Sequence, residues 1–184
     1  WAGAAAGRPW LMQIGVACGF VAIAIFVLEF ALIAKIRPVA GAFGMDGLVR
    51  LHRRMGILAA LLVAGHAGAL LWNGYPLEWL NPWGEFASWE MRWGVLAAVA
   101  LIALIVTALW RKRLHIAYEW WQWLHGVLAK LVVIAGAAHL LLFGGFSTEQ
   151  PMRILIAVYL VGLGMVSLYF EVWKPAVAWM RPWE

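Results

Sequence analysis

Long apolar runs, separated by short polar stretches, dominate the pattern along this chain. Each run approaches or exceeds the roughly 20 residues that a helix needs to cross a bilayer. We expect helices near residues 10–34, 48–72, 93–110, 118–143 and 152–173. Pro38, Asn73-Gly74 and Arg111-Lys112-Arg113 are examples of the breaks that follow these runs. The pattern predicts an all-α integral membrane bundle of about five spans, forming one domain over residues 1–184.

Composition supports a membrane protein and excludes several other classes. Hydrophobic residues make up 65% of the chain and charged residues only 12%, about half the usual charge of a soluble domain. The 14 tryptophans suit the aromatic belts found at membrane interfaces. The net charge of +5 comes from basic residues near helix ends, so we do not expect nucleic acid as a partner. The single cysteine, Cys18, excludes a disulfide framework or a cysteine-based metal site.

The placement of lysine and arginine predicts the orientation of the bundle. Ten fall on one side, which is then cytoplasmic: Lys35, Arg37, Arg50, Arg53, Arg54, Arg111, Lys112, Arg113, Lys174 and Arg181. Three fall on the other side: Arg8, Arg92 and Arg153. The N-terminus is therefore expected outside and the C-terminus in the cytoplasm. The loop over residues 73–90, rich in tryptophan and glutamate, is expected to lie along the outer membrane surface.

Two histidine pairs have the same spacing in two of the predicted helices. His52 and His66 are fourteen residues apart, and so are His125 and His139. Fourteen helical residues are just under four turns and rise about 21 Å, so each pair shares one helix face. The second and fourth predicted helices run in the same direction. Equal spacing then lets His52 face His125 and His66 face His139, which predicts two bis-histidine sites stacked across the membrane.

Two histidines on facing helices suit a haem iron, which they can bind from both axial sides. A zinc or copper site would need further ligands, and no Cys, Asp or Glu falls near on the same faces. Arg50, Arg53, Arg54 and Arg92 are candidate partners for haem propionates. Ordinary positive-inside charge explains the first three almost as well. Small residues line the proposed faces: Gly56, Ala59, Val63, Val132 and Gly136. The alternative is four unrelated histidines, each hydrogen-bonded to a neighbouring helix.

The stretches LHRRMG and RKRLHIAYEWWQWLHG, each with a second histidine fourteen residues on, carry a family resemblance. Over residues 45–174 the chain resembles the ferric reductase-like transmembrane domain of metalloreductases and NADPH oxidases, most closely its bacterial members. The resemblance implies an inner haem b on His52 and His125 and an outer haem b on His66 and His139. It also implies FAD and NAD(P)H on a further domain or a partner, since no Gly-rich dinucleotide turn occurs here. The family usually has six helices, one more than we find. Oxygen-reducing relatives have a further histidine at the position that Leu70 occupies here. The resemblance therefore gives less support to superoxide production by this chain.

These observations predict a multi-pass protein of the bacterial plasma membrane that transfers electrons outward. A cytoplasmic flavin/NAD(P)H domain or protein would be the donor, and ferric iron, oxygen, a quinone or a protein would be the acceptor. One alternative is a haem relay subunit that serves a partner protein or quinone. Another is a structural subunit of a larger membrane complex. Membrane lipids are the remaining expected partner.

Three further features have modest expected roles. His115 falls in the basic loop after the third helix, and we expect it to be solvated or lipid-facing. Lys130 is expected to pair with Glu29, with Glu171 as a competing partner and snorkelling to the interface as the alternative. Trp120, Trp121 and Trp123 are expected to anchor the inner membrane interface, with packing on a haem or a docked flavin domain in second place.

Overall fold

The computed structural model describes residues 10–33, 37–85, 88–143 and 150–169, together with residues 173 and 177. Five α-helices make up most of it: α2 (Trp10–Ile33), α3 (Arg37–Trp72), α4 (Trp89–Trp110), α5 (Tyr118–Leu142) and α6 (Gln150–Leu168). A short 3-10 helix, η1 (Leu77–Leu80), lies between α3 and α4. Every regular element in this described part is helical, which confirms the predicted all-α class.

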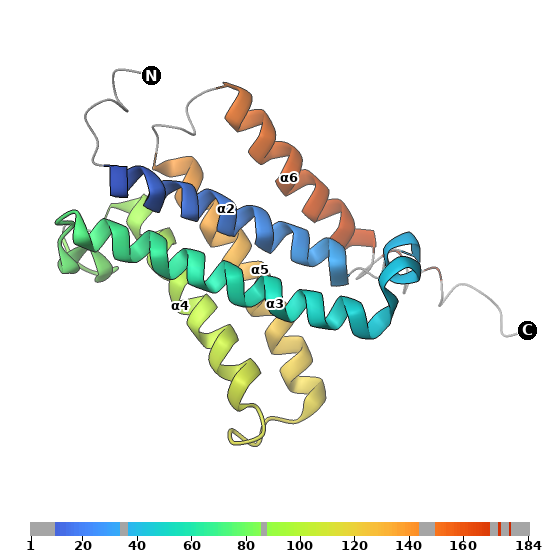
Figure 1. Ribbon diagram of the computed structural model, residues 1–184. Coiled ribbons are helices and arrows are strands. Elements are labelled where there is room, and N and C mark those ends of the chain that lie inside the picture. Colours follow the sequence, from blue (N-terminus) through green and yellow to red (C-terminus); the bar gives the residue numbers. More distant parts are fainter. Residues whose placement is uncertain are drawn as a thin grey trace, which may run out of the picture.

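The helices pack as two hairpins. The α2 helix packs along α3, and α4 packs along α5, with much less contact between the two hairpins. Figure 1 shows the second hairpin crossing behind the first, with α6 on the side of α2 away from α3. The α2 helix also touches α5 and α6. Within each hairpin two consecutive helices pack together, as short connections between antiparallel helices favour.

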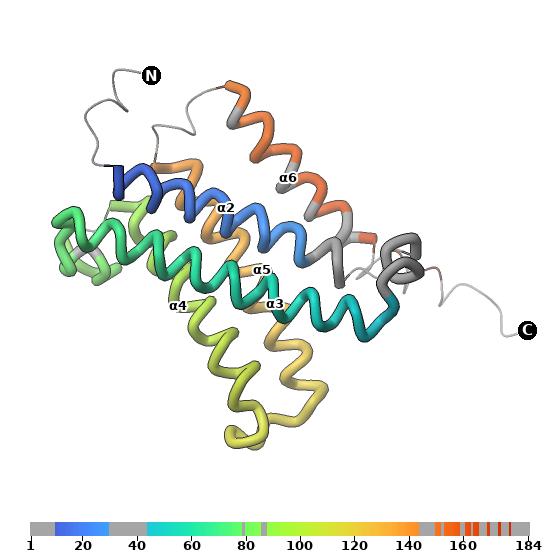
Figure 2. The backbone as a smooth tube through the Cα atoms, in the orientation of Figure 1, coloured from blue at the N-terminus to red at the C-terminus, as the bar shows by residue number. Residues whose placement is uncertain are grey.

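The α3 and α5 helices run in the same general direction. The colour sequence in Figure 2 shows that both helices end on the side of the molecule where α2 and α4 begin. This is the relative direction that alternating spans predict for the second and fourth helices. Positions at the beginning of α3 can therefore meet positions at the beginning of α5, and later positions can meet later ones.

The predicted end of α3 is confirmed, and its cause is visible. Gly74 adopts a positive φ of 84°, and the Tyr75 amide donates a 3.2 Å hydrogen bond back to the Leu70 carbonyl. A glycine in this conformation caps the last free carbonyls of a helix.

The start of α4 differs from expectation, because the helix begins at Trp89 rather than near residue 93. Its first turn includes the charged side chain of Glu90, which the positive end of a helix tolerates well.

The start of α3 also differs from the expected break at Pro38. Helical backbone begins at Arg37, and the interruption falls at Gly44, which has φ 67° and ψ 160°. This backbone conformation is almost confined to glycine. The membrane-spanning portion of α3 therefore begins at Gly44, four residues before the predicted boundary near Leu48.

Four helical segments are long and apolar enough to cross a membrane: Trp10–Glu29, Gly44–Trp72, Trp89–Trp110 and Tyr118–Leu142. A helix satisfies its own backbone polar groups, which is what a lipid environment demands. Large apolar side chains cover the outside of these spans, among them Ile57, Leu61, Val99, Ile102 and Ile134. The chain is therefore a multi-pass membrane protein. The fifth helix, α6, is not among these four, and a span over 152–173 stays a prediction.

Some residues used for orientation or pairing lie outside the described part of the chain. They are Arg8, Lys35, Glu171, Lys174 and Arg181.

Gly44 offers a test of the α3 kink. A Cβ added there would meet no atom within 4 Å, so Gly44→Ala changes the backbone energy alone. We expect a loss of roughly 1–3 kcal/mol of stability, because alanine is strained at this φ and ψ. Thermal unfolding in detergent measures the effect. Gly56→Ala is the matched control, because Gly56 is helical within α3 and also has open space. Equal unfolding midpoints for both variants would contradict the proposed strain.

Candidate functional site: two histidine pairs between the hairpins

The structure brings the four helix-borne histidines together in two pairs, as their spacing predicted. The rings of His52 and His125 have centroids 6.2 Å apart and lie at 74° to one another. The rings of His66 and His139 have centroids 6.3 Å apart and lie at 73°. We call these the 52–125 pair and the 66–139 pair. Each pair joins α3 to α5, so the rings connect two hairpins that otherwise make little contact.

Each histidine of the 66–139 pair uses one ring nitrogen to form a hydrogen bond with the neighbouring helix of its own hairpin. The Nδ1 atom of His66 donates to the carbonyl of Gly15 on α2, at 2.9 Å. The Nδ1 atom of His139 donates to the carbonyl of Glu90 on α4, at 2.7 Å. A carbonyl can only accept, so in both rings Nδ1 carries the proton. The remaining nitrogen, Nε2, then has a free lone pair that can bind a metal.

The 52–125 pair is held differently. His52 uses its Nδ1 atom to contact Oε2 of Glu29, a buried carboxylate on α2. The Nδ1 atom of His125 is buried and has no hydrogen-bond partner among the described residues. Glu29 was expected to pair with Lys130, and the structure gives it His52 as its partner instead. No sequence signal in Glu29 alone pointed to the histidine, because the two residues are joined only by the packing of α2 on α3.

Two glycines bring the 66–139 rings close to their supporting helices. A Cβ on Gly19 would lie 3.1 Å from Nδ1 of His66, and one on Gly94 would lie 2.9 Å from Nδ1 of His139. Each glycine follows its acceptor carbonyl by four residues, from Gly15 to Gly19 and from Glu90 to Gly94. Four residues are about one helical turn, so acceptor and glycine share a face. Sequence reasoning missed both positions. One sequence signal could have found them. It is a glycine that comes four residues after the helix position lying level with a histidine of the neighbouring helix.

The separation of the paired rings fits a metal held between them. Metal–imidazole bonds of about 2.0 Å, with each ring centre about 1.1 Å beyond its nitrogen, place two trans imidazoles with centroids roughly 6.2–6.4 Å apart. Plain edge-to-face ring contact spans about 4.5–7 Å, so the distance alone is not specific. The Nδ1 anchoring of three of the four rings is the more specific feature. Metal-binding histidines characteristically donate their other ring N–H to a carboxylate or carbonyl.

The donor set also limits which metal group fits. Among the described residues, no cluster of three or more His, Cys, Asp or Glu side chains is placed to hold a metal ion. A metal held by two imidazoles of the described residues would need its other ligands from a non-protein group. A haem iron, whose four equatorial ligands come from the macrocycle, has this requirement.

The layer between the two pairs is apolar. Ala59 lies seven residues from each histidine of α3, and Val132 lies seven residues from each histidine of α5. Both are buried. Val132 forms a core cluster with Ala100 and Leu101 of α4, against which Val63 packs. Of the other small residues singled out from the sequence, Gly136 lies against Ile23 of α2, and Gly56 has open space around it.

The aromatic residues before His125 divide into two groups. Trp121 is partly buried beside His125, with ring centroids 5.2 Å apart, and its indole nitrogen has no hydrogen-bond partner. Arg111 lies over the Trp121 ring at 5.7 Å. Trp120 and Trp123 are exposed and stack edge to face with each other, which suits interfacial anchoring. Trp121 thus belongs to the surroundings of the histidine pair.

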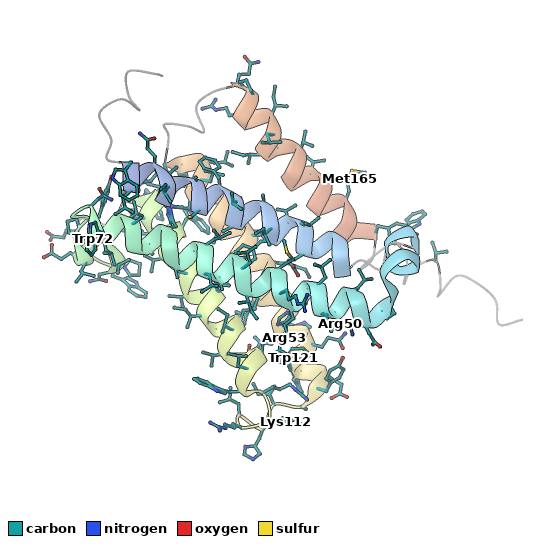
Figure 3. All side chains as sticks on the ribbon, viewed as in Figure 1. Arg50, Arg53, Trp72, Lys112, Trp121 and Met165 are labelled. Carbon is teal, nitrogen blue, oxygen red and sulfur yellow. The ribbon has the colours of Figure 1, made fainter. Side chains whose placement is uncertain are left out.

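The basic candidates lie at the ends of the bundle. Arg50, Arg53 and Arg54 are exposed on α3 beside His52. Figure 3 places Arg50, Arg53 and Lys112 away from Trp72, which lies at the other end of α3. Arg92 stacks on Trp89 at 5.0 Å and lies two residues after Glu90, whose carbonyl accepts from His139. His115 is exposed in the loop between α4 and α5, with φ 54°, and lies apart from both pairs, as expected.

These features define a multi-pass helical membrane protein with two partly buried histidine pairs joining its hairpins. The chain matches the family described as "Ferric reductase like transmembrane component" over residues 18–136. The chain therefore belongs to the ferric reductase-like transmembrane family, as its histidine motifs suggested. The matched region contains His52, His66 and His125, and it ends three residues before His139.

The chain is also similar to an uncharacterized protein of Archaeoglobus fulgidus. The two are 26% identical over 169 residues, which cover 82% of this chain and 89% of the relative. No solved structure matches the chain. Family membership is thus the functional information that comparison contributes.

The glycine contacts lead to a stability test. Gly94→Ala places a methyl group against the His139 ring, and Gly19→Ala does the same at His66. We expect each variant to lose roughly 1–3 kcal/mol through overpacking, with the larger loss at Gly94. Thermal unfolding in detergent is the measurement. Gly68→Ala on α3 is the control, because its added methyl meets nothing within 4 Å. Losses no greater than that of the control would contradict the close packing of glycine on histidine.

Proposed function

We propose that this protein carries electrons across the plasma membrane of a bacterium through two b-type haems, as the membrane part of a metal reductase. His52 and His125 would hold one haem, and His66 and His139 the other. The observation that carries the proposal is the ring geometry. Two imidazole pairs stand at a separation that suits one metal each, and three of the four rings have Nδ1 engaged by a neighbouring helix. Haem iron would supply reversible one-electron chemistry at each pair.

The residues of the chain contribute position, insulation and charge. Glu29, Gly15 and Glu90 orient three of the rings and leave Nε2 as the ligating nitrogen. Val63, Ala59 and Val132 keep the layer between the pairs dry, which excludes water and stray protons from the path. With His52 and His125, or His66 and His139, as its two protein ligands, a bound haem would offer one-electron chemistry without an open position for an acceptor. Reduction of an acceptor would then take place at the edge of the bound group, without binding to the iron.

The charge distribution supports an outward direction. Arg50, Arg53, Arg54 and the 111–113 cluster lie at the end of the bundle that carries the 52–125 pair, so we assign that end to the cytoplasm. Arg92 lies at the opposite end. These arginines are also the candidate partners of the haem propionates. A reduced flavin on the cytoplasmic side would lose two electrons and two protons, and two ferric ions outside would each gain one electron.

FAD and NAD(P)H would then be bound by a further domain or a separate protein. Ferric iron is the acceptor we favour because the chain belongs to the ferric reductase-like family. A quinone or a protein acceptor would make the chain a relay subunit. Purification with dithionite-reducible haem but without NAD(P)H-dependent ferric reduction, even after a flavin reductase is added, would favour the relay.

Haem stoichiometry tests the proposal directly. The pyridine haemochrome assay on purified protein should give two b-type haems per chain, with low-spin spectra in both oxidation states. One haem per chain would leave one histidine pair structural and break the path. Absence of haem would overturn the proposal.

Histidine substitutions test the assignment of each ligand. His66→Ala should lower the haem content from two to one, because the 66–139 pair loses one axial nitrogen. His52→Ala should have the same effect at the 52–125 pair. His115→Ala is the matched control and should keep both haems, because His115 lies in an exposed loop. Haem loss in the His115 variant equal to that in the His66 variant would overturn the assignment.

A further inference from the structure

The two histidine pairs differ in the charge of their hydrogen-bond partners. The 66–139 pair is held by two neutral backbone carbonyls, of Gly15 and Glu90. The 52–125 pair has one carboxylate partner, Glu29, and one ring nitrogen without a partner. A carboxylate acceptor makes a stronger, charge-assisted hydrogen bond than a carbonyl does. The two sites are therefore alike in ligands and unlike in electrostatics.

The helix register explains the difference. Moving fourteen residues along α2 leads from Gly15 to Glu29, while the same step back along α3 leads from His66 to His52. In the second hairpin, fourteen residues along α4 lead from Glu90 to Leu104, while the step back along α5 leads from His139 to His125. Glu29 and Leu104 thus occupy equivalent levels in the two hairpins. A leucine side chain offers no carboxylate, and the Leu104 carbonyl accepts from the Thr107 hydroxyl instead. The Nδ1 atom of His125 therefore has no acceptor among the described residues.

Glu29 is buried, so its negative charge acts on His52 with little screening by solvent. The residue is 6% exposed, and it is the one charged side chain in the buried core of the described residues. Within the described part of the chain, its second oxygen, Oε1, has no hydrogen-bond partner. The nearby arginines of α3, Arg50, Arg53 and Arg54, are exposed, so solvent and salt screen their charges. A buried carboxylate is screened far less, and its field at His52 is correspondingly strong.

We propose that Glu29 is a positioning residue that lowers the reduction potential of the 52–125 site below that of the 66–139 site. This inference rests on the proposed function, since it concerns a metal bound between the rings. Oxidised iron carries one more positive charge than reduced iron, so a nearby carboxylate stabilises the oxidised form more. The hydrogen bond to His52 acts in the same direction, because it makes the imidazole a more basic ligand. Electrons entering at the cytoplasmic end would then move toward the site of higher potential.

The test is the Glu29→Gln variant of the haem-loaded protein, titrated by spectroelectrochemistry. Glutamine keeps the size of the side chain and an oxygen that accepts from His52, but it removes the charge. We expect the reduction potential of the 52–125 site to rise. At a fixed applied potential, the ratio of oxidised to reduced haem at this site should then fall at least tenfold. That change corresponds to 59 mV for a one-electron couple. The 66–139 site should stay unchanged, and Glu29→Asp should return the potential toward the original value.

Glu119→Gln is the matched control. It removes the same charge from an exposed position near the beginning of α5, six residues before His125. This variant should leave both potentials in place. Unchanged potentials in Glu29→Gln, with two haems bound, would overturn the inference and leave the proposed function standing. An equal shift at both sites would overturn it as well, because the effect would then not pass through His52.

A second measurement covers the case in which Glu29→Gln loses the haem of its site. His66→Ala retains the 52–125 site and His52→Ala retains the 66–139 site, so each potential can be measured alone. The site retained in His66→Ala should titrate at the lower potential. Equal or reversed potentials would overturn the inference. Absence of haem from the unsubstituted protein would overturn the proposed function and this inference together.

Discussion

A histidine ring inside an apolar bundle needs a partner for its polar nitrogens, because lipid and apolar side chains offer none. In this protein the adjacent helix of each hairpin supplies that partner for three of the four rings. The requirement couples the packing of α2 on α3, and of α4 on α5, to the direction in which each ring points. Gly19 and Gly94 belong to the same arrangement, since any larger side chain would separate ring and helix.

The two hairpins hold their histidine rings in the same way at the 66–139 pair and in different ways at the 52–125 pair. At the 66–139 pair both rings have a backbone carbonyl and a glycine one turn further along. At the 52–125 pair one hairpin offers a carboxylate and the other a leucine at the equivalent level. A single exchange of residue type in a repeated register thus makes two otherwise similar sites unequal. The difference in reduction potential that we propose for the two sites rests on this inequality.

The apolar layer between the pairs serves stability and the proposed function at once. Val132, Ala100 and Leu101 bury apolar surface where the two hairpins approach each other. Ala59 and Val132, midway between the two pairs along α3 and α5, are buried and apolar as well. Charged residues gather instead near the ends of the bundle, where Arg50, Arg53 and Lys112 lie in Figure 3.

The sequence by itself determined the helical class, the order of the spans and the pairing of the histidines. Long apolar runs allow only helices in lipid, and equal fourteen-residue spacing on helices of the same direction brings rings together in register. The tertiary structure decided the partners of those rings and the kink at Gly44. His52 and Glu29 are 23 residues apart, and their contact depends on how α2 and α3 rotate and slide against each other. Such rotation follows from the packing of whole helix faces, and no local pattern of residues encodes it.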